Sequence, residues 1–382
     1  MSKDASSISG GPVKPARWIA LLGREDTPTD GVEDYCSFLG RALAPQGIEL
    51  ERVRIPWLEI GWIGALRRLA RVSSTWRGRW VLLQYTALTW SRRGFPAGVV
   101  LALAVLLGRG ARVAIVFHES CRQGRGPRPR WLDHLRGVCQ DCVIQILYRG
   151  AAKSVFTVPL ETVAWLPKGE SKAAFISIGA NIPERVSRRP APTIAGGEKT
   201  VIVFGVTGAP VMAREVEQIA LVMRQASEEL GKMRLIAVGR GSAEAKELLV
   251  EALDGCSVEV VVRGVLPAEE VASELESADV LLFLRGPITP YRGSAIAGIA
   301  CGLPIVGYRN GEIGDAFKEA GIEWSPWRDR ESLTRGLVRV LSDPHRWMEL
   351  HERNLVAQRN WFSWAAIAEQ FCRVLKTRGS SS

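Results

Sequence analysis

The chain has 382 residues, more than one hydrophobic core usually serves, so two domains are expected. Lys and Arg outnumber Asp and Glu by 50 to 40, and residues 1–190 hold 28 of the basic residues against 15 acidic ones, so the basic excess lies in the first half. This distribution favours an anionic partner: a phosphate-bearing ligand, a membrane surface or a nucleic acid. Because the Arg residues are dispersed and no nucleic-acid-binding module is recognisable, we expect no nucleic-acid partner.

Seven cysteines at irregular spacing, without a signal peptide, are typical of a reduced cytoplasmic protein rather than a disulfide framework. Cys139 and Cys142 form a single C-x-x-C within a helical pattern, which we interpret as buried structural cysteines, so no metal is expected. The longest apolar run, from Ala97 to Leu107, is shorter than the roughly 20 residues that a bilayer requires. It predicts a buried or interfacial helix.

The first half alternates between strand-like and helix-like segments after a Ser-, Gly- and Lys-containing tail at residues 1–16. Gly23 to Pro28 is predicted as a loop, and Asp30 as the N-cap of a helix that runs to about Ala44. The alternation predicts a parallel sheet covered by helices. The predicted strands are Trp18–Leu22, Leu50–Ile55, Trp80–Gln84, Arg112–Phe117, Ser154–Val158 and Ala174–Ile178.

A segment rich in Arg, Pro and Gly at residues 185–199 predicts a linker between an N-terminal domain (17–184) and a C-terminal domain (200–355). A last helix at 356–376 is predicted to cross back to the first domain. The sequence thus predicts two doubly wound α/β domains, with the carboxyl ends of both sheets at a cleft between them. The strands predicted for the second domain are Val201–Phe204, Leu235–Val238, Val258–Val262, Val280–Leu284 and Pro304–Val306.

Several motifs carry a resemblance to a known family. The order and spacing of Gly264-Val265-Leu266-Pro267, Glu269-Glu270-Val271, Ala278-Asp279-Val280 and Ala300-Cys301-Gly302-Leu303-Pro304-Ile305-Val306 resemble the second domain of glycosyltransferase family 4. In the first half, Asp30 to Tyr35 is similar to the family's first glycine loop and helix, and Val116-Phe117-His118-Glu119 resembles its strand ending in a catalytic-region histidine. The resemblance implies two Rossmann-like domains facing a cleft, the GT-B fold, and retaining transfer from a nucleotide sugar without a metal cofactor.

The chain departs from that family at its acidic residues. Thr289 and Ala297 occupy the positions of the two glutamates that family members commonly have. The loop that starts at Gly205 has neither the Arg nor the Lys that relatives offer to the donor diphosphate, and Arg214 lies just beyond it. The sequence Arg292-Gly293-Ser294 resembles the Arg-Gly-Ser variant of a subset of bacterial relatives.

In such an enzyme the leaving diphosphate must be neutralised by cationic side chains and helix N-termini. We expect Arg292, with the backbone amides of Gly293 and Ser294, to do this, and the alternative is an ordinary surface Arg before an N-capping Ser. Gly205, Gly239 and Thr289 complete the expected donor-binding residues. A tight strand-to-helix turn explains Gly239 equally well, and Thr289 would donate only a hydrogen bond to the sugar.

On the other side of the expected cleft, His118 ends a strand where a parallel sheet would present it to the ligand, and Glu119 follows it. We expect His118 to contact the donor sugar and Glu119 to orient it or an acceptor hydroxyl. The alternatives are a structural histidine and a solvated acid. Gly31 is the expected acceptor-side loop residue, although a capped helix after a turn also accounts for it.

Basic and aromatic segments raise the question of a membrane. The stretch from Trp62 to Arg71 has an apolar face and clustered Arg, and Trp76 to Trp80 continues it, which suits anionic headgroups as well as a helix packed on the sheet. The Arg residues from Arg122 to Arg130 would clamp an anionic acceptor or belong to a solvated loop.

Together, the residues and the resemblance predict a cytoplasmic glycosyltransferase, with a peripheral contact to the inner face of the membrane as a further expectation. It would move a sugar from a nucleotide-sugar donor to a glycan or lipid-linked acceptor in polysaccharide or glycoconjugate biosynthesis. Two rival classes are a non-catalytic sugar-nucleotide-binding partner subunit, suggested by the missing glutamates, and a nucleic-acid-binding protein, suggested by the basic first half.

Overall fold

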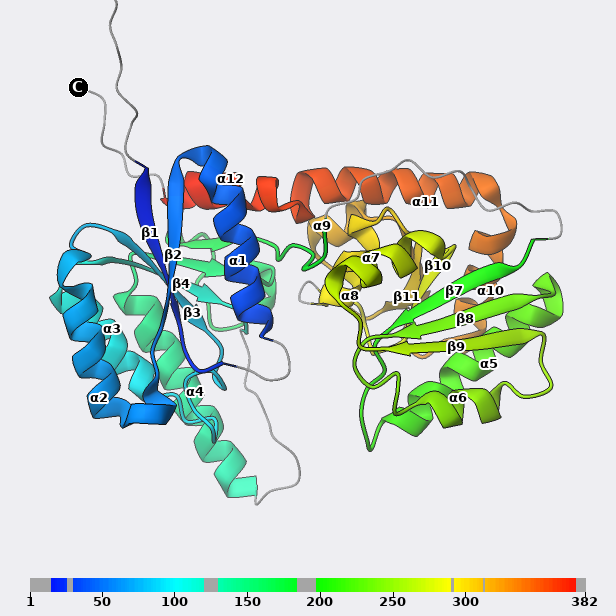
Figure 1. Cartoon of the computed structure of the whole chain (residues 1–382), viewed down its shortest axis with the longest axis horizontal. Helices are drawn as coiled ribbons and strands as arrows, with labels where there is room; N and C mark the ends of the chain where they lie inside the picture. Colours follow the sequence, from blue (N-terminus) through cyan, green and yellow to red (C-terminus); the bar gives the residue numbers. More distant parts are fainter. Residues whose placement is uncertain are drawn as a thin grey trace, which may run out of the picture. The chain divides into compact units, whose positions relative to one another are not determined.

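The computed structural model describes residues 15–25, 30–119, 130–183, 197–289, 292–311 and 313–375 (Figure 1). The chain forms two compact units. The first comprises the chain up to Val155, Gly169–Ala174 and the chain from Ala368, and the second comprises Phe156–Lys168 and Phe175–Ile367. Most of the predicted tail and linker, and Arg122, Arg125 and Arg128 of the loop after Glu119, lie outside the described residues.

The first unit is built on a six-stranded sheet with the strand order β2-β1-β3-β4-β5-β6. Its central pairs are parallel: β1 pairs with β2 on one side and with β3 on the other. The strand order therefore reverses between β1 and β3, and ligands of doubly wound sheets bind beyond the carboxyl ends of strands at such a point. The strands are β1 (Ala16–Leu22), β2 (Ile48–Arg54), β3 (Trp80–Tyr85), β4 (Arg112–Phe117), β5 (Lys153–Phe156) and β6 (Ala173–Phe175).

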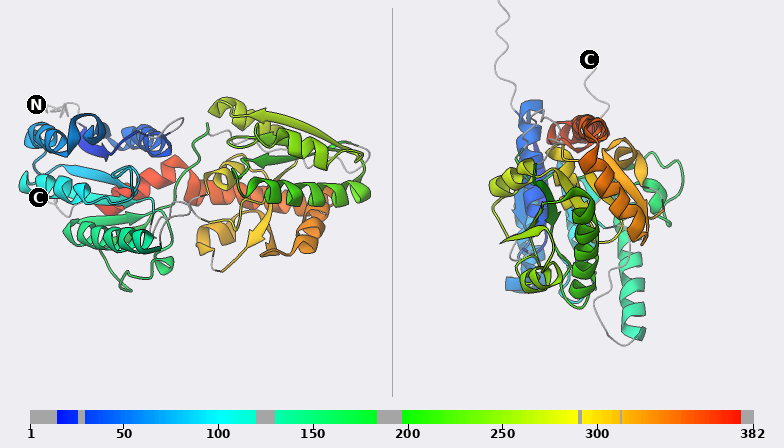
Figure 2. Two further views of the ribbon diagram at one scale, coloured as in Figure 1. Left: turned by 90° about the horizontal axis from the view of Figure 1, so that it is seen from below. Right: turned by 90° about the vertical axis from the view of Figure 1, so that its right-hand side faces the viewer.

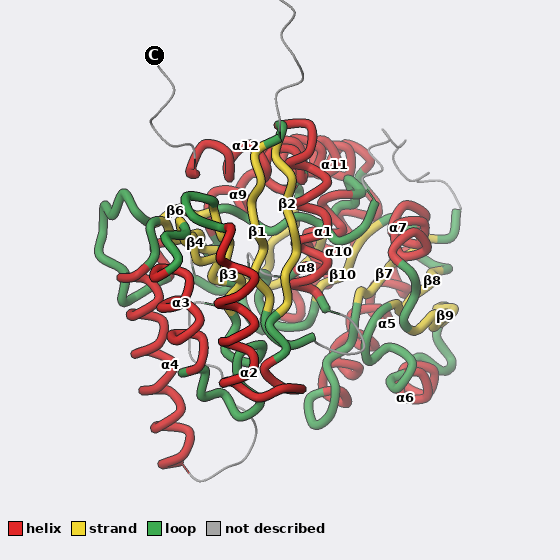
Figure 3. Tube along the Cα trace, turned by 60° about the vertical axis from the view of Figure 1, so that its left-hand side comes forward, coloured by secondary structure: helices red, strands yellow, loops and turns green. Residues whose placement is uncertain are grey.

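Helix α1 (Gly31–Leu43) begins where the sequence predicts, because the Oδ1 atom of Asp30 accepts hydrogen bonds from the backbone N–H groups of Val32 (3.1 Å) and Glu33 (3.0 Å). The other helices, α2 (Trp57–Val72), α3 (Gly98–Gly108) and α4 (Arg130–Gly150), lie side by side in that order and form one layer, named here the α2–α4 layer (Figures 2 and 3). Short 3₁₀ turns occur at Ala44–Gln46 and Ser73–Thr75, and at Leu160–Thr162 in the second unit.

The tryptophans of the stretch that suited a membrane pack against other side chains of the unit. Trp62 stacks on Trp57, with ring centroids 5.5 Å apart, and on Trp90 at 6.3 Å. Trp76 and Trp80 are only 3% and 7% exposed. Trp76 and Trp80 are therefore not available to headgroups, and Trp62 is half-buried.

The second unit contains another six-stranded sheet, in the order β12-β11-β10-β7-β8-β9. All its registered pairs are parallel. The chain builds β7, β8 and β9 outward in one direction and then returns to place β10 on the other side of β7, so the strand order reverses between β7 and β10. The strands are β7 (Lys199–Phe204), β8 (Met233–Val238), β9 (Val258–Gly264), β10 (Val280–Phe283), β11 (Ile305–Arg309) and β12 (Ile322–Pro326), of which β12 was not predicted.

Helices cover this sheet, and one apolar cluster lies on each of its faces. The small side chains of α8 are explained by close packing: a Cβ on Gly298 would lie 2.7 Å from a methyl carbon of Leu281 in β10. Ala295 to Ala300 are all buried. The helices are α5 (Met212–Leu230), α6 (Lys246–Ala252), α7 (Ala268–Ser277), α8 (Gly293–Ala300), α9 (Gly314–Glu319), α10 (Arg330–Ser342), α11 (Pro344–Ala357) and α12 (Trp364–Leu375), whose last residues belong to the first unit.

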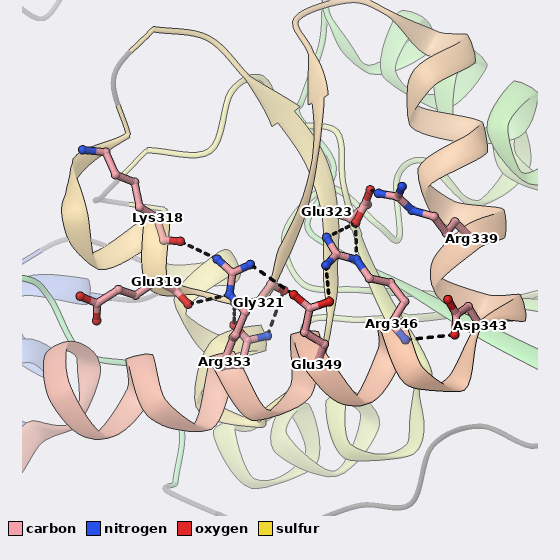
Figure 4. A network of polar contacts seen from close by, with 10 residues as sticks. Lys318, Glu319, Gly321, Glu323, Arg339, Asp343, Arg346, Glu349 and Arg353 are labelled. Carbon is pink, nitrogen blue, oxygen red and sulfur yellow. Dashed lines mark hydrogen bonds and ion pairs between the residues drawn. The ribbon is translucent and has the colours of Figure 1, made fainter.

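A network of charges fastens α10 and α11 to β12 (Figure 4). The Glu323 side chain is 7% exposed and pairs with Arg339 and Arg346, and the Oε2 atom of Glu323 accepts bonds of 2.9 and 2.7 Å from Arg346. Asp343 caps α11 by accepting from the backbone N–H groups of His345 and Arg346. A buried carboxylate is stable only when its charge is paired in this way.

The predicted single C-terminal helix is broken. After α11 the chain makes a π-helical turn at Gln358–Phe362, and Ser363 is extended, with φ −69° and ψ 142°. The break turns two large side chains inward: Phe362 packs on Phe317 with ring centroids 5.1 Å apart, and the Trp364 indole N–H donates to the carbonyl of Ala180 at 2.8 Å. A continuous helix would not present both rings to the core.

Candidate functional site

A pocket of about 350 Å³ lies in the second unit at the point where the strand order reverses. The loop after β7 contributes Thr207, the segment after β10 contributes Arg285 and Gly286, and the residue before α8 contributes Arg292. These residues lie far apart in the sequence. They meet because the carboxyl ends of β7 and β10 are neighbours in the sheet.

Arg285 supplies the cation that the β7 loop lacks. A Cβ on Gly205 would lie 2.5 Å from the Nη1 atom of Arg285, so the guanidinium occupies the space that the glycine leaves. Burial lowers the pKa of Arg285; Glu215 opposes this shift, and Arg292 and Arg240 add to it. The buried Nε atom of Arg285 has no hydrogen-bond partner among the described residues. A buried, incompletely paired cation is a favourable place for an anionic ligand.

Arg292 and the start of α8 lie beside Arg285. The Arg292 backbone N–H donates to the carbonyl of Thr289 at 2.9 Å, and its guanidinium passes 3.7 Å from the position of a Cβ on Gly286. No side chain caps α8. Within the described part of the chain, the backbone N–H groups of Gly293 and Ser294 have no partner, and there is open space around the Gly293 Cα. Helix N–H groups in this state attract anions.

The pocket has one buried carboxylate, which sequence reasoning missed. Glu215 is 4% exposed, and its Oε2 atom accepts from the Thr207 backbone N–H at 3.2 Å. Its Oε1 atom has no partner among the described residues. Glu215 lies in the first turn of α5, where an acidic residue is ordinary because of the helix dipole. Its proximity to Arg285 is visible only in the folded chain.

An aromatic wall closes the other side of the pocket. The rings of Tyr308 and Trp327 meet edge to face with centroids 5.3 Å apart. Arg328, which also lines the pocket, has φ 68°, and it is the one residue other than glycine with positive φ in the part of the chain that the structure describes. Such a conformation costs on the order of 1–3 kcal/mol and tends to occur at functional sites.

The structure accounts for other predicted donor-binding residues by packing. A Cβ on Gly239 would lie 2.9 Å from the Phe204 ring, and the Gly239 N–H donates to the carbonyl of Gly264 at 2.6 Å. These contacts are those of a tight strand-to-helix turn, so a donor contact of Gly239 stays a prediction. The Thr289 Oγ1 atom is buried without a described partner, and Ala297 is 2% exposed within an apolar cluster, where a glutamate would lack solvation.

In the first unit, His118 and Glu119 follow β4 at the carboxyl edge of the sheet, as predicted. The Nε2 atom of His118 lies 2.8 Å from the Oε1 atom of Gln84, whose amide nitrogen donates to the Leu82 carbonyl at 3.3 Å. Because that orients Gln84 with its oxygen toward the ring, His118 donates from Nε2 and its Nδ1 atom is the unprotonated one. The ring also meets Tyr35 edge to face at 5.0 Å.

Burial perturbs both ionisable groups of this pair. It lowers the pKa of His118 to about 4, with a small opposing effect of Asp30, so the imidazole is neutral near pH 7. It raises the pKa of Glu119 to about 7, although the Ala87 backbone N–H donates to the carboxylate at 3.4 Å. A neutral imidazole and a carboxyl group that titrates near neutrality are suited to hydrogen bonds with sugar hydroxyls and to proton exchange. Gly31 opens α1 with no atom within 4 Å of a Cβ on it, so its acceptor-side role stays a prediction.

Comparison with known proteins gives these sites a context. Residues 199–343 match the family model described as glycosyl transferases group 1, and no curated protein sequence matches the chain. Among solved structures, sucrose-phosphate synthase from Thermosynechococcus elongatus has a TM-score of 0.64 at 17% identity, covering 94% of this chain and 98% of that one. A glycosyltransferase from Rickettsia africae has a TM-score of 0.64 at 13% identity, covering 96% and 100%.

A third relative was solved with a ligand. HepE from Anabaena, in complex with UDP-glucose, has a TM-score of 0.62 at 13% identity, covering 94% of this chain and 99% of that one. At these identities the structural likeness shows the fold, and the match over residues 199–343 shows the family of the second unit. The predicted pair of doubly wound domains is thus confirmed as a GT-B fold, and residues 199–343 of the second unit match the glycosyl transferases of group 1.

Proposed function

We propose that the chain transfers a sugar from a nucleotide-sugar donor to a glycan or lipid-linked acceptor, with retention of configuration. The observation that carries the donor assignment is the pocket of the second unit, which Arg285 and Arg292 line and at which the uncapped helix α8 begins. A diphosphate matches this arrangement because it presents several oxygens to charged and backbone donors at once. HepE, which shares the fold, binds UDP-glucose.

In this proposal Arg285 and Arg292 hold the diphosphate and neutralise the charge that develops on it when the sugar leaves. The amides of Gly293 and Ser294 add hydrogen bonds and the positive end of the helix dipole. Glu215, with its Oε1 atom open, accepts a hydrogen bond from a ligand hydroxyl. His118 and Glu119 contact sugar hydroxyls on the side of the first unit. The leaving-group charge is met by protein cations, so transfer proceeds without a metal and continues in EDTA.

The donor class is tested by the shift in melting temperature that uridine, guanosine and adenosine diphosphates and their sugars produce. We expect one base to give a selective shift, and Arg285→Ala and Arg292→Ala to remove it. Release of the nucleoside diphosphate from the matching donor, with an acceptor present, then separates the enzyme from a non-catalytic sugar-nucleotide-binding subunit. Selective binding without any release supports the subunit, and no shift from any nucleotide contradicts the donor site.

Localisation and pathway belong to the same proposal. We propose a cytoplasmic protein that acts in polysaccharide or glycoconjugate biosynthesis, because nucleotide-sugar donors are made in that compartment. Fractionation of cells into cytosol, membrane and periplasm tests the localisation, and recovery in the periplasm would contradict it.

A further inference from the structure

Exposed apolar side chains are concentrated on one part of the first unit. In the described ranges of the chain, sixteen large hydrophobic side chains are exposed, and ten of them lie on α2, α3 or α4. None lies on α1. Isolated exposed apolar residues are normal on a protein surface, but a concentration on neighbouring helices marks an interaction surface. The outer face of the α2–α4 layer therefore requires a partner.

Helix α3 has no polar side chain between Gly98 and Gly108. Its inner face is buried, yet Leu101 is 52% exposed and Leu107 is 44% exposed on the opposite face. A surface helix ordinarily carries polar residues on its outer side. The apolar run thus forms a helix, as predicted. Its inner face is buried, and its outer face is exposed and able to form an interface.

Helix α4 continues the apolar surface. Trp131, Leu135, Val138 and Ile146 are 66%, 51%, 40% and 44% exposed. Their spacing places them along one side of the helix. Cys142, which was expected to be buried, is exposed between them, so that interpretation was wrong.

The opposite side of α4 is fixed to the unit. The Nε atom of Arg136 donates to the Arg93 carbonyl at 3.0 Å, and the Gln140 side-chain amide donates to the Gly94 carbonyl at 3.0 Å. Both donors are buried, at 3% and 1% exposure. The apolar stripe is therefore turned away from the interior, and it is not a core face exposed by chance.

Helix α4 also extends beyond its neighbours. It has 21 residues and α3 has 11, and the carboxyl end of α4 lies against the second half of α3, because a Cβ on Gly150 would be 2.8 Å from Leu103 and 3.8 Å from Leu107. At a rise of 1.5 Å per residue, the ten additional residues carry the start of α4 about 15 Å past α3. Figures 1 and 3 show this projecting end. Trp131 lies in its first turn, and tryptophan favours the boundary between lipid and water.

Positive charge lies beside these apolar side chains. Arg67, Arg68 and Arg71 are exposed on α2, next to α3, and Glu59 is the one acidic residue of that helix. A second copy of the chain packed through this face would bring like charges together. Anionic lipid headgroups would complement them.

We propose that the outer face of the α2–α4 layer docks on an anionic lipid bilayer. Leu101, Leu135 and Trp131 enter the boundary between headgroups and acyl chains, and the Arg residues of α2 contact the headgroup phosphates. The contact is peripheral. No helix within the described ranges is long and apolar enough to cross a membrane.

Co-sedimentation of the full chain with vesicles tests this proposal. We expect binding to vesicles of equal parts phosphatidylcholine and phosphatidylglycerol, and much weaker binding to vesicles of phosphatidylcholine alone. Salt at about 0.5 M should weaken the binding to the anionic vesicles. Leu101→Glu and Leu135→Glu should each weaken binding at least about fivefold, because a charge must enter the boundary. Leu248→Glu, at a 39% exposed position on α6 in the second unit, is the matched control and should bind as the wild type does.

Several results would overturn the proposal: no binding to either vesicle, equal binding to both, or equal effects of Leu101→Glu and Leu248→Glu. A wild-type dimer in sedimentation equilibrium that Leu101→Glu converts to a monomer, without vesicle binding, would assign the surface to a second copy. Thermal unfolding checks each variant, and Leu135→Glu repeats the test on another helix if Leu101→Glu does not fold. Vesicle binding needs no donor, so it is decided separately from the proposed function.

Discussion

Gly205→Ala tests whether the glycine after β7 exists to admit Arg285. Gly205 has φ 81°, a conformation that costs an L-residue about 1–2 kcal/mol. The new methyl group would also lie 2.5 Å from the Arg285 Nη1 atom, so the guanidinium must leave its place over the loop. We expect a loss of about 1–2 kcal/mol in the free energy of unfolding.

The effect on ligand binding is the more diagnostic one. A hydrogen bond to a charged group contributes about 1.5–3 kcal/mol, so displacing Arg285 should weaken binding of the nucleoside diphosphate by about 10- to 150-fold. Isothermal titration calorimetry with the diphosphate that the thermal-shift panel selects measures this change. Gly208→Ala in the same loop is the matched control, because no atom lies within 4 Å of a Cβ there and its φ is not positive.

Two outcomes would refute the reasoning. If Gly205→Ala binds the diphosphate as tightly as Gly208→Ala does, the glycine does not position the guanidinium. If Arg285→Ala also binds normally, Arg285 does not contact the diphosphate at all. A loss in Arg285→Ala alone would keep the ligand contact and remove only the explanation of Gly205.

Further predictions concern the leaving group, the buried titrating pair and the charge network. Arg292→Ala should abolish turnover with little change in melting temperature, and unchanged turnover would contradict its role. Between pH 4.5 and 7 the native state binds more protons at Glu119 than the unfolded chain does, so the contribution of Glu119 to the free energy of unfolding falls by up to about 3 kcal/mol as pH rises. Between pH 4 and 6.5 the native state binds fewer protons at His118 than the unfolded chain does, so the contribution of His118 to the free energy of unfolding rises with pH. In urea titrations the free energy of unfolding of Glu119→Gln should therefore rise from pH 4 to 6.5, and that of His118→Asn should fall from pH 4.5 to 7. The same pH dependence in both variants would contradict this. Glu323→Gln should destabilise the fold by about 2 kcal/mol, because it leaves two guanidinium groups poorly paired, whereas Glu331→Gln, in a pair with side chains 64% and 82% exposed, should change stability by less than about 1 kcal/mol.

The sequence predicted the α/β class because strands and helices depend mainly on nearby residues. The apolar runs that end at Leu22, Phe117 and Phe204 are all strands in the structure, and the Asp30 cap places the start of α1. The spacing of the motifs from Gly264 to Val306 pointed to the glycosyltransferase family of the second unit. Those patterns are local, so no knowledge of distant contacts was needed.

The contents of the pocket were only half predictable. Arg292 was found because it precedes a recognisable helix. Arg285 was missed, although it lies two residues after the end of a buried strand, where the carboxyl edge of a sheet presents side chains to ligands. Glu215 gave no signal, since an acidic residue in a first helical turn is ordinary.

What the sequence determined by itself is the order of most elements and the likeness of the second unit to the glycosyltransferase family. Only the tertiary structure decided which cations meet and which faces remain exposed. Arg285 reaches Gly205 because β10 returns to the side of β7. Leu69 of α2 is buried while Leu101 of α3 is exposed because of how three helices share one face of a sheet. The physical reason is that strand order and helix neighbours are set by long-range packing, which the local pattern of polar and apolar residues does not specify.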